Sequence, residues 1–301
     1  MRALVTGGAG FIGSHLVDVL QEAGDEVTVV DRLRTEANLQ RAIERGARLV
    51  SADVTDVPAM LEAFAEARPE VVFHLAAQID VRRSVEDPSM DAHQNVGGTA
   101  AILEAARVGG ARRVILASTA AVYGDPVRLP IAEDTEIAPL APYGASKAAA
   151  ESYLALFSRA YGLSTLALRM SNVYGPRQSP HGEAGVIAIW CSAAAEDRPV
   201  TVFGDGAQTR DFVYVEDVVR GFLAAAHTAD EGALNLSTGV ETSLVDLAAT
   251  LGLRTESGPG RLGEIARSSL DPSAAAARLG WRASTPLAEG LRKTLASMRG
   301  E

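Results

Sequence analysis

The sequence predicts an α/β protein with a doubly wound parallel sheet and a smaller mixed α/β lobe. Two observations predict this fold class. Short β-branched apolar runs alternate with longer segments of helical spacing over roughly the first 170 residues, and the runs show little polar alternation. Such strands are buried on both faces of a sheet, and right-handed crossovers place helices on both faces.

Six segments in the first half are expected to be strands of this sheet: Ala3–Thr6, Val27–Asp31, Arg48–Ala52, Val71–Leu75, Val114–Ser118 and Thr165–Met170. Helical spacing appears between them in Phe11–Ala23, Pro58–Ala67 and Ala92–Val108. Later in the chain we expect helices at Val218–Ala226 and Ser243–Leu251 and a strand at Ala233–Leu236. Residues 1–171 are therefore assigned to the domain that holds the parallel sheet, with about 205–240 woven back into it, and 172–301 mainly to the smaller lobe.

Composition and charge narrow the functional classes. The net charge of −10 argues against nucleic acid or an anionic membrane as the main partner. The five histidines show no paired metal-ligand spacing, so no metal is expected. Cys191 is the only cysteine, and no apolar run is long enough to span a membrane. Because a strand pattern begins at Met1 without a leader, a reducing cytoplasm is the expected location.

A glycine-rich loop predicts a dinucleotide site. The strand ending at Thr6 continues into a loop with glycines at 7, 8, 10 and 13, and a helix follows. Glycine permits a tight turn and close approach to a pyrophosphate, while the helix N-terminus supplies amides. The expected contacts in this loop are Gly7, Gly10, Phe11, Ile12 and Gly13.

The ends of later strands extend this site. Asp31 ends the next strand, where a carboxylate accepts from both ribose hydroxyls and disfavours a 2′-phosphate, so NAD is the expected cofactor. The neighbouring Arg32 and Arg34 weaken that preference. Asp53 and Val54 are expected near the adenine. The small residues Leu75, Ala76 and Ala77 let the cofactor cross the sheet edge.

Tyr143 and Lys147 form the most informative pair in the chain. With six tyrosines and two lysines in 301 residues, a chance spacing of four is expected about 0.04 times. A compact ammonium beside a phenol favours the phenolate and brings its pKa toward working pH. An exposed pair without a role is the alternative. The pattern favours a tyrosine acting as general acid and base.

These motifs together resemble the extended short-chain dehydrogenase/reductase family, and within it the nucleotide-sugar 4-epimerases. The resemblance runs nearly end to end, through Thr6–Gly13, His74–Ala77, Ser118–Gly124, Tyr143 with Lys147, Asn172–Arg177 and Thr209–Asp217. It implies a Rossmann-type fold that binds NAD, and epimerisation at C4 of a UDP-hexose through a transient 4-keto sugar. It also adds Asn95 to the cofactor contacts.

The resemblance implies a catalytic group of Thr119, Tyr143 and Lys147. Tyr143 takes the proton of the sugar hydroxyl, Thr119 hydrogen-bonds the same oxygen, and Lys147 holds the nicotinamide ribose. Many relatives have Ser where this chain has Thr119, and the hydroxyl is kept.

Substrate contacts also carry over from the family pattern. They are Ala120 beside the catalytic threonine, Asn172 and Arg210 at the diphosphate, Val202 and Phe203 near the base, Arg261 and Glu264 as a clamp, and Ser268 near the sugar. Ser268 is small where enzymes restricted to unacetylated sugars have a bulky aromatic residue. A 2-acetamido group should therefore fit, so UDP-N-acetylglucosamine is an expected second substrate.

Other readings stay open at this point. A reductase, a 4,6-dehydratase or an epimerase acting at another carbon shares most of these motifs. The dehydratase needs an Asp-Glu pair after the threonine, where this chain has Ala120 and Ala121. A non-catalytic NAD-sensing protein would have no need of an activated phenol. Relatives usually dimerise through helices corresponding to Ala92–Val108 and Tyr143–Tyr161, so a homodimer is expected by analogy.

Overall fold

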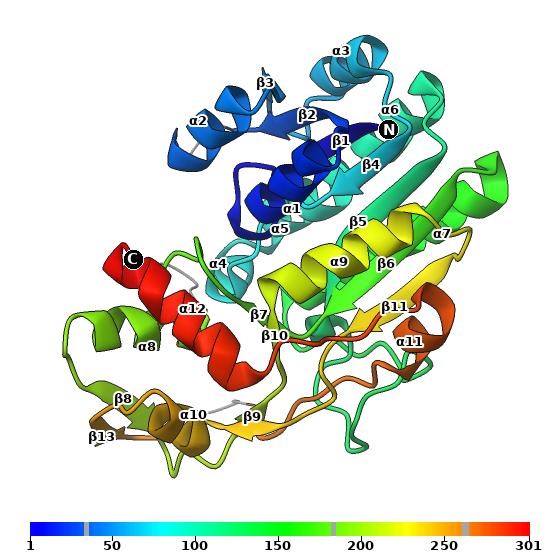
Figure 1. Ribbon diagram of the computed structural model, residues 1–301. Coiled ribbons are helices and arrows are strands. Elements are labelled where there is room, and N and C mark those ends of the chain that lie inside the picture. The colour runs from blue at the N-terminus through cyan, green and yellow to red at the C-terminus, as the bar shows by residue number, and fades with distance from the viewer. Residues whose placement is uncertain (33–35, 182–184, 261–264) are drawn as a thin grey trace. The chain divides into compact units, whose positions relative to one another are not determined.

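The protein is described by a computed structural model covering residues 1–32, 36–181, 185–260 and 265–301. Its chain forms two compact units, each made of three separate segments. Figure 1 labels their helices and strands. Unit 1 comprises Met1–Gly124, Glu136–Arg169 and Val219–Leu234. Unit 2 comprises Asp125–Thr135, Met170–Val218 and Asn235–Glu301. Arg34, Arg261 and Glu264 lie outside the described residues.

A seven-stranded sheet organises unit 1, in the order β11-β6-β5-β4-β1-β2-β3. Registers between β1 and β2, β1 and β4, β2 and β3, and β4 and β5 are all parallel. The predicted strands are confirmed, and Ala233–Leu236 joins the same sheet at its edge. The strands are β1 Arg2–Thr6, β2 Glu26–Asp31, β3 Arg48–Ser51, β4 Val71–His74, β5 Arg113–Thr119, β6 Ser164–Met170 and β11 Gly232–Leu236.

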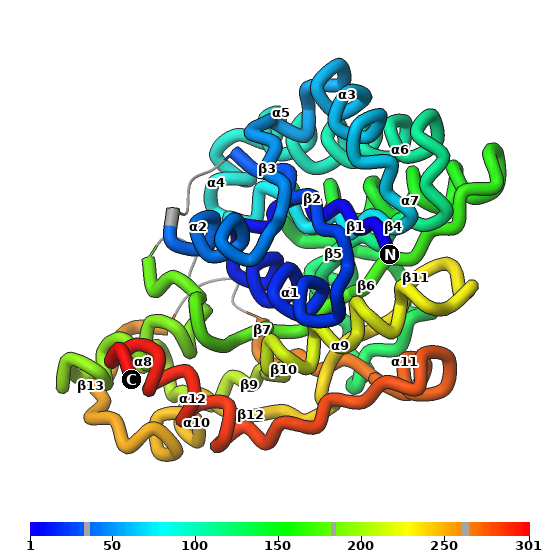
Figure 2. Tube along the Cα trace, turned by 45° about the horizontal axis from the view of Figure 1, so that its top comes forward, coloured from blue at the N-terminus to red at the C-terminus, as the bar shows by residue number. Residues whose placement is uncertain are grey.

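Helices cover both faces of this sheet, as expected for strands buried on both sides. Figures 1 and 2 show α1 and α9 on one face and α3, α6 and α7 on the other. The predicted helix Ala92–Val108 is composite, because a π-helical turn (η1) separates α5 from α6. The helices are α1 Phe11–Glu22, α2 Glu36–Glu44, α3 Val57–Ala67, α4 Val81–Glu86, α5 Pro88–Ala92, η1 His93–Gly97, α6 Gly98–Gly109, α7 Pro142–Tyr161 and α9 Val215–Ala226.

The strand order places a topological switch point beside β1. The chain passes from β1 to β2 and β3 on one side, then returns to β4 on the other. The loops that follow β1 and β4 therefore diverge at the carboxyl edge of the sheet, where open α/β sheets bind their ligands. Side chains such as Leu4, Val72 and Ile102, all completely buried, fill the core that keeps these loop ends in place.

Unit 2 is built from short strand pairs and helices. Its strand pairs are β7 Asn172–Tyr174 with β10 Phe212–Tyr214, β8 Val200–Phe203 with β13 Thr255–Gly258, and β9 Thr209–Arg210 with β12 Thr242–Ser243. Its helices are α8 Val186–Ala195, α10 Leu244–Thr250, α11 Ser273–Leu279 and α12 Leu287–Arg299. The buried Asp211 carboxylate ties this unit together by accepting from the amides of Thr238 and Gly239 at 3.0 Å each.

The described part of the chain contains no helix with the length and hydropathy of a membrane span. Within the same residues, no group of three His, Cys, Asp or Glu side chains is arranged to hold a metal ion.

Candidate active site

The glycine-rich loop between β1 and α1 has the shape of a cradle. Gly7 has a φ of 68°, and a Cβ there would meet the Ala76 amide nitrogen at 2.8 Å. A Cβ on Gly13 would lie 2.2 Å from the Gly7 carbonyl oxygen. Gly10 caps α1 without a side chain, so the first amides of this helix receive no side-chain cap. The loop therefore offers backbone amides at a close distance to an anionic ligand, as a pyrophosphate requires.

Asp31 at the end of β2 fixes the middle of this loop. One of its carboxylate oxygens accepts from the Ala9 amide at 3.0 Å, and the Asn38 side chain donates to the Ala9 carbonyl at 2.9 Å. The Ala9 peptide is thus held on both sides. The sequence offered no sign of Asn38, because its partner is 29 residues away.

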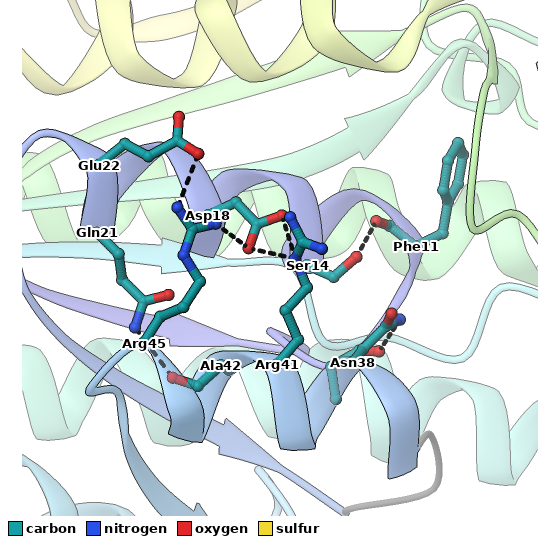
Figure 3. Close-up of polar contacts among 10 residues, drawn as sticks. Phe11, Ser14, Asp18, Gln21, Glu22, Asn38, Arg41, Ala42 and Arg45 are labelled. Atoms are coloured by element: carbon teal, nitrogen blue, oxygen red, sulfur yellow. Dashed lines mark hydrogen bonds and ion pairs between the residues drawn. The ribbon is translucent and has the colours of Figure 1, made fainter. Parts of the chain in front are cut away.

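Ion pairs between α1 and α2 hold α2 in the position from which Asn38 contacts the loop. The half-exposed Arg41 guanidinium lies 2.9 Å from the Asp18 carboxylate, and Arg45 contacts both Asp18 and Glu22 (Figure 3). Asp18 is largely buried, so these two arginines satisfy a charge that would otherwise be costly. They hold α2 against α1, with Asn38 in the first turn of α2, where it contacts Ala9.

Arg32 and Asp53, two predicted cofactor contacts, form an ion pair at 3.0 Å. Partial burial opposes ionisation of Asp53, but hydrogen bonds from Thr55 and the charge of Arg32 hold its pKa below the usual value. Arg32 is therefore engaged with a carboxylate next to the predicted adenine position. Val54 beside it is buried against α6, where a Cβ on Gly98 would meet it at 2.8 Å.

A buried histidine connects the loop after β4 to the rest of the cradle. Thr99 donates to the Asn95 carbonyl at 2.6 Å, so it accepts from His74 Nε2 at 3.2 Å. Because Nε2 is the donor, Nδ1 of the neutral ring accepts from the Thr6 hydroxyl at 2.7 Å, and Thr6 in turn accepts from the Ala76 amide at 3.1 Å. This network assigns the imidazole proton to Nε2. Burial, aided by the positive charge of Lys147, lowers the pKa of His74 to about 3.

Leu75, Ala76 and Ala77 are half-buried in the loop that follows β4. The Leu75 amide continues the sheet pattern by donating to the Thr6 carbonyl at 3.1 Å. Their contact with the cofactor stays a prediction.

The three predicted catalytic residues meet at the end of β5 and the first turns of α7. Thr119 is the last residue of β5, and its hydroxyl is hydrogen-bonded to the Tyr143 phenol. Pro142 starts α7, and the Tyr143 amide in its first turn donates to Ser84 Oγ at 3.2 Å. Lys147 lies one turn further along α7 and is 3% exposed. The group predicted from sequence is thus assembled within unit 1.

Burial controls the protonation of this group. Loss of hydration raises the pKa of Tyr143 to about 12; the Thr119 hydrogen bond lowers it and the charge of Asp91 raises it. Burial lowers the pKa of Lys147 to about 8, while Glu151 and Asp91 oppose this shift. The expectation that Lys147 brings the tyrosine pKa toward neutrality is not met in this structure, because desolvation of the phenol outweighs every other effect.

Asn95 links three segments around the catalytic helix. It lies in the π-helical turn η1, a type of turn frequent at functional sites. Its side-chain oxygen accepts from the Gln78 amide at 2.8 Å, and its amide group donates to the Gln78 carbonyl, the Asp91 carboxylate and Ser146 Oγ. A direct contact between Asn95 and the cofactor stays a prediction. Gln78, Asp91 and Ser146 were not found from the sequence.

A second cluster of polar side chains, formed by Ser118, Glu151, Arg169 and Tyr123, connects β5 with α7 and β6. Ser118 donates to the Glu151 carboxylate at 2.5 Å, and Arg169 forms a close ion pair with the same carboxylate. Arg169 also donates to the Tyr123 hydroxyl at 2.8 Å and lies over its ring. Glu151 follows Lys147 by one turn, so this cluster fixes a negative charge beside the lysine.

The residues present fit a bound dinucleotide. The glycine cradle, the carboxylate of Asp31 and the ammonium of Lys147 border one edge of the sheet, on β1, β2 and α7. The Lys147 side chain is 3% exposed. Ribose hydroxyls are acceptors that its ammonium could use.

The substrate residues that are described lie in two groups. Ala120 is half-buried in unit 1 and begins the 3-10 turn Ala120–Val122 behind Thr119, whose hydroxyl accepts from the Ala121 amide at 3.2 Å. The other described residues belong to unit 2: Asn172, Val202, Phe203, Arg210 and Ser268.

Within unit 2, three of these residues contact neighbours that were not among the predicted substrate residues. Phe203 at the end of β8 pairs with Gly258 of β13. Arg210 donates to the Ile265 carbonyl at 2.8 Å, immediately after the segment that carries Arg261 and Glu264. Asn172 is exposed, and its side chain donates to the Asp211 carbonyl at 3.3 Å. Ser268 is half-buried, and its predicted contact with the sugar stays a prediction.

Comparison with known proteins places this geometry in a family. Residues 3–237 match the NAD dependent epimerase/dehydratase family. A UDP-glucose 4-epimerase of Mycolicibacterium smegmatis is 45% identical, with 100% of this chain and 99% of the relative covered. A UDP-glucose 4-epimerase of Thermotoga maritima, solved with UDP-glucose, is 41% identical, with a TM-score of 0.94 over 100% of this chain and 99% of that one.

A third relative was solved with a cofactor. The UDP-glucose 4-epimerase of Thermus thermophilus, in complex with NAD, is 40% identical, with a TM-score of 0.91 over 100% of this chain and 99% of that one. Family match, full-length identity and fold agree with the arrangement of the glycine cradle and the Thr119–Tyr143 pair. This chain belongs to the NAD dependent epimerase/dehydratase family.

Proposed function

We propose that this chain is an NAD-dependent UDP-hexose 4-epimerase that interconverts UDP-glucose and UDP-galactose through a 4-keto sugar. One observation carries the proposal most directly: the Thr119 hydroxyl hydrogen-bonds the Tyr143 phenol one turn before a buried Lys147. The relatives named UDP-glucose 4-epimerase match this chain over its full length, which supports the same activity here.

The proposed roles follow from the positions of the side chains. NAD, when bound, would supply reversible hydride transfer at C4 of the sugar. Tyr143 takes the proton of the C4 hydroxyl and later gives it back, so it acts as base and then acid. Thr119 holds the same sugar oxygen, while Lys147 binds the nicotinamide ribose and stabilises the phenolate.

Tyr143 must lose its phenol proton before it can take the proton of the C4 hydroxyl. With its pKa raised to about 12, Tyr143 is protonated at neutral pH. A positive charge close to the phenol favours its ionised form. Lys147 supplies one such charge as long as it stays an ammonium, which makes its own protonation essential to the proposed mechanism.

A dehydratase activity is not favoured by the turn that follows Thr119. Elimination of water needs an acid–base pair, and Ala120 and Ala121 occupy those positions. Their methyl groups cannot transfer protons.

A second substrate is proposed from Ser268. Its small, half-buried side chain leaves room for a 2-acetamido group, so we expect UDP-N-acetylglucosamine to be converted as well. Purified protein is incubated with each sugar nucleotide without added NAD, and the products are identified by proton NMR. A Ser268→Tyr variant should lose activity on the acetylated sugar and keep it on UDP-glucose. Full activity of this variant on both would remove the basis for the second substrate.

A homodimer is proposed from the exposed surface of α6 and α7. Large apolar side chains on these helices are unusually open: Val108 is 60% exposed, Leu156 46% and Tyr161 56%. Burying them against a second copy would favour association. The molar mass measured by light scattering should be twice the 31.4 kDa of one chain, and Leu156→Asp should reduce the molar mass to that of one chain. A cytoplasmic location is part of the same proposal, since the single free Cys191 is typical of reducing compartments.

A further inference from the structure

The Asp91 carboxylate is buried next to the catalytic helix but only half satisfied. It lies in α5 and is 1% exposed. One oxygen accepts from the Gln78 side chain at 2.8 Å and from the Asn95 side chain at 3.2 Å. The other oxygen is buried and has no hydrogen-bond partner among the described residues. Such a group is costly to bury, so a compensating charge is expected nearby.

The charged groups on the packed elements identify that compensation. On α7, Lys147 is nearly buried and its charge interacts with Asp91. Glu151 on the same helix is already held by Arg169. Tyr143, also on α7, is half-buried and carries no positive charge. The other described ionisable groups on the elements packed against α5 are exposed: Arg82, Arg83 and Glu86 on α4, His93 on η1, and Tyr153, Arg159 and Tyr161 on α7. Lys147 is therefore the buried cation that Asp91 faces.

Asp91 also orders the surroundings of the catalytic pair. Through Asn95 it is connected to Ser146, whose hydroxyl donates to the Tyr143 carbonyl at 3.0 Å. Through Gln78 it is connected to the loop after β4. One carboxylate is thus linked to the loop after β4 through Gln78 and to the catalytic helix through Asn95.

We propose that Asp91 is a positioning residue for the reaction: its buried carboxylate fixes Asn95 and Gln78 against the first turn of α7 and places a negative charge near Lys147. The reaction is the proposed epimerisation, but the charge balance is a property of the protein alone. It can therefore be tested whether or not the chain is an epimerase.

Removal of the Asp91 charge has a defined electrostatic consequence. Asp91 opposes the burial that lowers the pKa of Lys147, so its loss lowers that pKa further. Asp91 also raises the pKa of Tyr143, so its loss lowers that pKa as well. Both groups shift in the same direction, and the whole pH profile of kcat should move to lower pH. A purely structural defect lowers kcat without such a displacement.

The chain's two lysines make a direct titration possible. Protein labelled with 13C at lysine Cε gives two NMR signals, one from Lys147 and one from the partly exposed Lys293, and Lys293→Arg assigns them. In Asp91→Asn, which replaces the carboxylate by an amide of nearly equal size, the Lys147 midpoint should fall by about one pH unit. The Lys293 midpoint should not move.

Asp87→Asn is the matched control. Asp87 is exposed and caps α5 by accepting from the Met90 amide at 2.9 Å, a role that asparagine also performs. This variant removes the same charge from the same short helix, and the Lys147 midpoint should stay at its wild-type value.

The outcomes separate the proposal from the proposed function. A lowered Lys147 midpoint with a displaced kcat profile supports the role of Asp91, and a lowered midpoint in a protein without epimerase activity supports it while removing the epimerase. An unchanged midpoint in folded Asp91→Asn overturns it. If that variant does not fold, Asp91→Ser, which leaves room for a water in place of the carboxylate, carries the same expectations.

Discussion

The buried His74 predicts a pH dependence of stability whose size follows from the structure. In the unfolded chain its pKa is near 6.5, and in the folded protein burial lowers it to about 3. The folded state therefore holds the neutral imidazole, and stability is complete above pH 6.5. As the pH falls below that value, His74 binds a proton in the unfolded chain but stays neutral in the folded protein. Stability is therefore lost progressively until about pH 3.

The magnitude can be worked out for an accessible range. Between pH 6.5 and pH 5 the loss is about 1.5 pH units at about 1.4 kcal/mol each, or roughly 2 kcal/mol. His74→Gln removes the titration and keeps both hydrogen bonds, because the glutamine oxygen accepts from Thr6 and its amide donates to Thr99. Its stability should consequently fall about 2 kcal/mol less than that of wild type between pH 7 and pH 5.

Urea unfolding at the two pH values measures this difference. Circular dichroism follows the whole chain, whereas fluorescence follows unit 2 alone, because Trp190 and Trp281 both belong to that unit. Carboxylates that titrate in the same range contribute equally to both proteins and cancel. His93→Gln, which replaces an exposed imidazole on η1, is the control and should retain the full wild-type loss. Equal losses in wild type and His74→Gln would refute the reasoning.

Three further predictions concern the cofactor and the chemistry. Gly13→Ala places a Cβ 2.2 Å from the Gly7 carbonyl oxygen, which is a clash with the backbone. Absorbance and extraction of the purified variant should therefore show no bound NAD. Gly97→Ala, whose Cβ has no neighbour nearer than 3.6 Å, should retain NAD. Asp31→Ala removes the acceptor for the ribose and for the Ala9 amide, so NAD affinity should fall about 10-fold or more in calorimetric titration and discrimination against NADP should narrow; unchanged discrimination would contradict the role of Asp31. Tyr143→Phe should lower kcat by about 100-fold or more with NAD still bound, whereas Tyr153→Phe on the exposed side of α7 should not; comparable kcat in the two variants would rule out Tyr143 as the acid–base group.

The sequence predicted the central sheet well because its signals are local. Apolar runs such as Val71–His74 are long enough to be recognised, and the loop Thr6–Gly13 carries its own context of strand and helix. By contrast, β9 and β12 have only two residues each, too few for any periodicity. Helical spacing across Ala92–Val108 could not show the π-helical turn that carries Asn95, since apolar spacing continues through it.

The catalytic pair was predictable because its two residues are close in the sequence, whereas its surroundings come from distant segments. Tyr143 and Lys147 are four residues apart on one helix, so their spacing is visible in the sequence. The contacts that set their environment join distant segments: Asn95 reaches Ser146 across 51 residues, and Thr6 reaches His74 across 68. The expected lowering of the Tyr143 pKa was wrong for this reason, because its desolvation depends on packing that no local pattern records.

One measurement tests the central claim most directly. UDP-glucose carrying deuterium at C4 is incubated in ordinary water with purified protein and no added NAD, and the products are followed by NMR and by absorbance of reduced nicotinamide. The expected product is UDP-galactose that retains the deuterium at C4, with no accumulation of reduced cofactor, because the hydride leaves and returns within one site. Exchange of the label with solvent, or reduction of the cofactor in proportion to product, would contradict it.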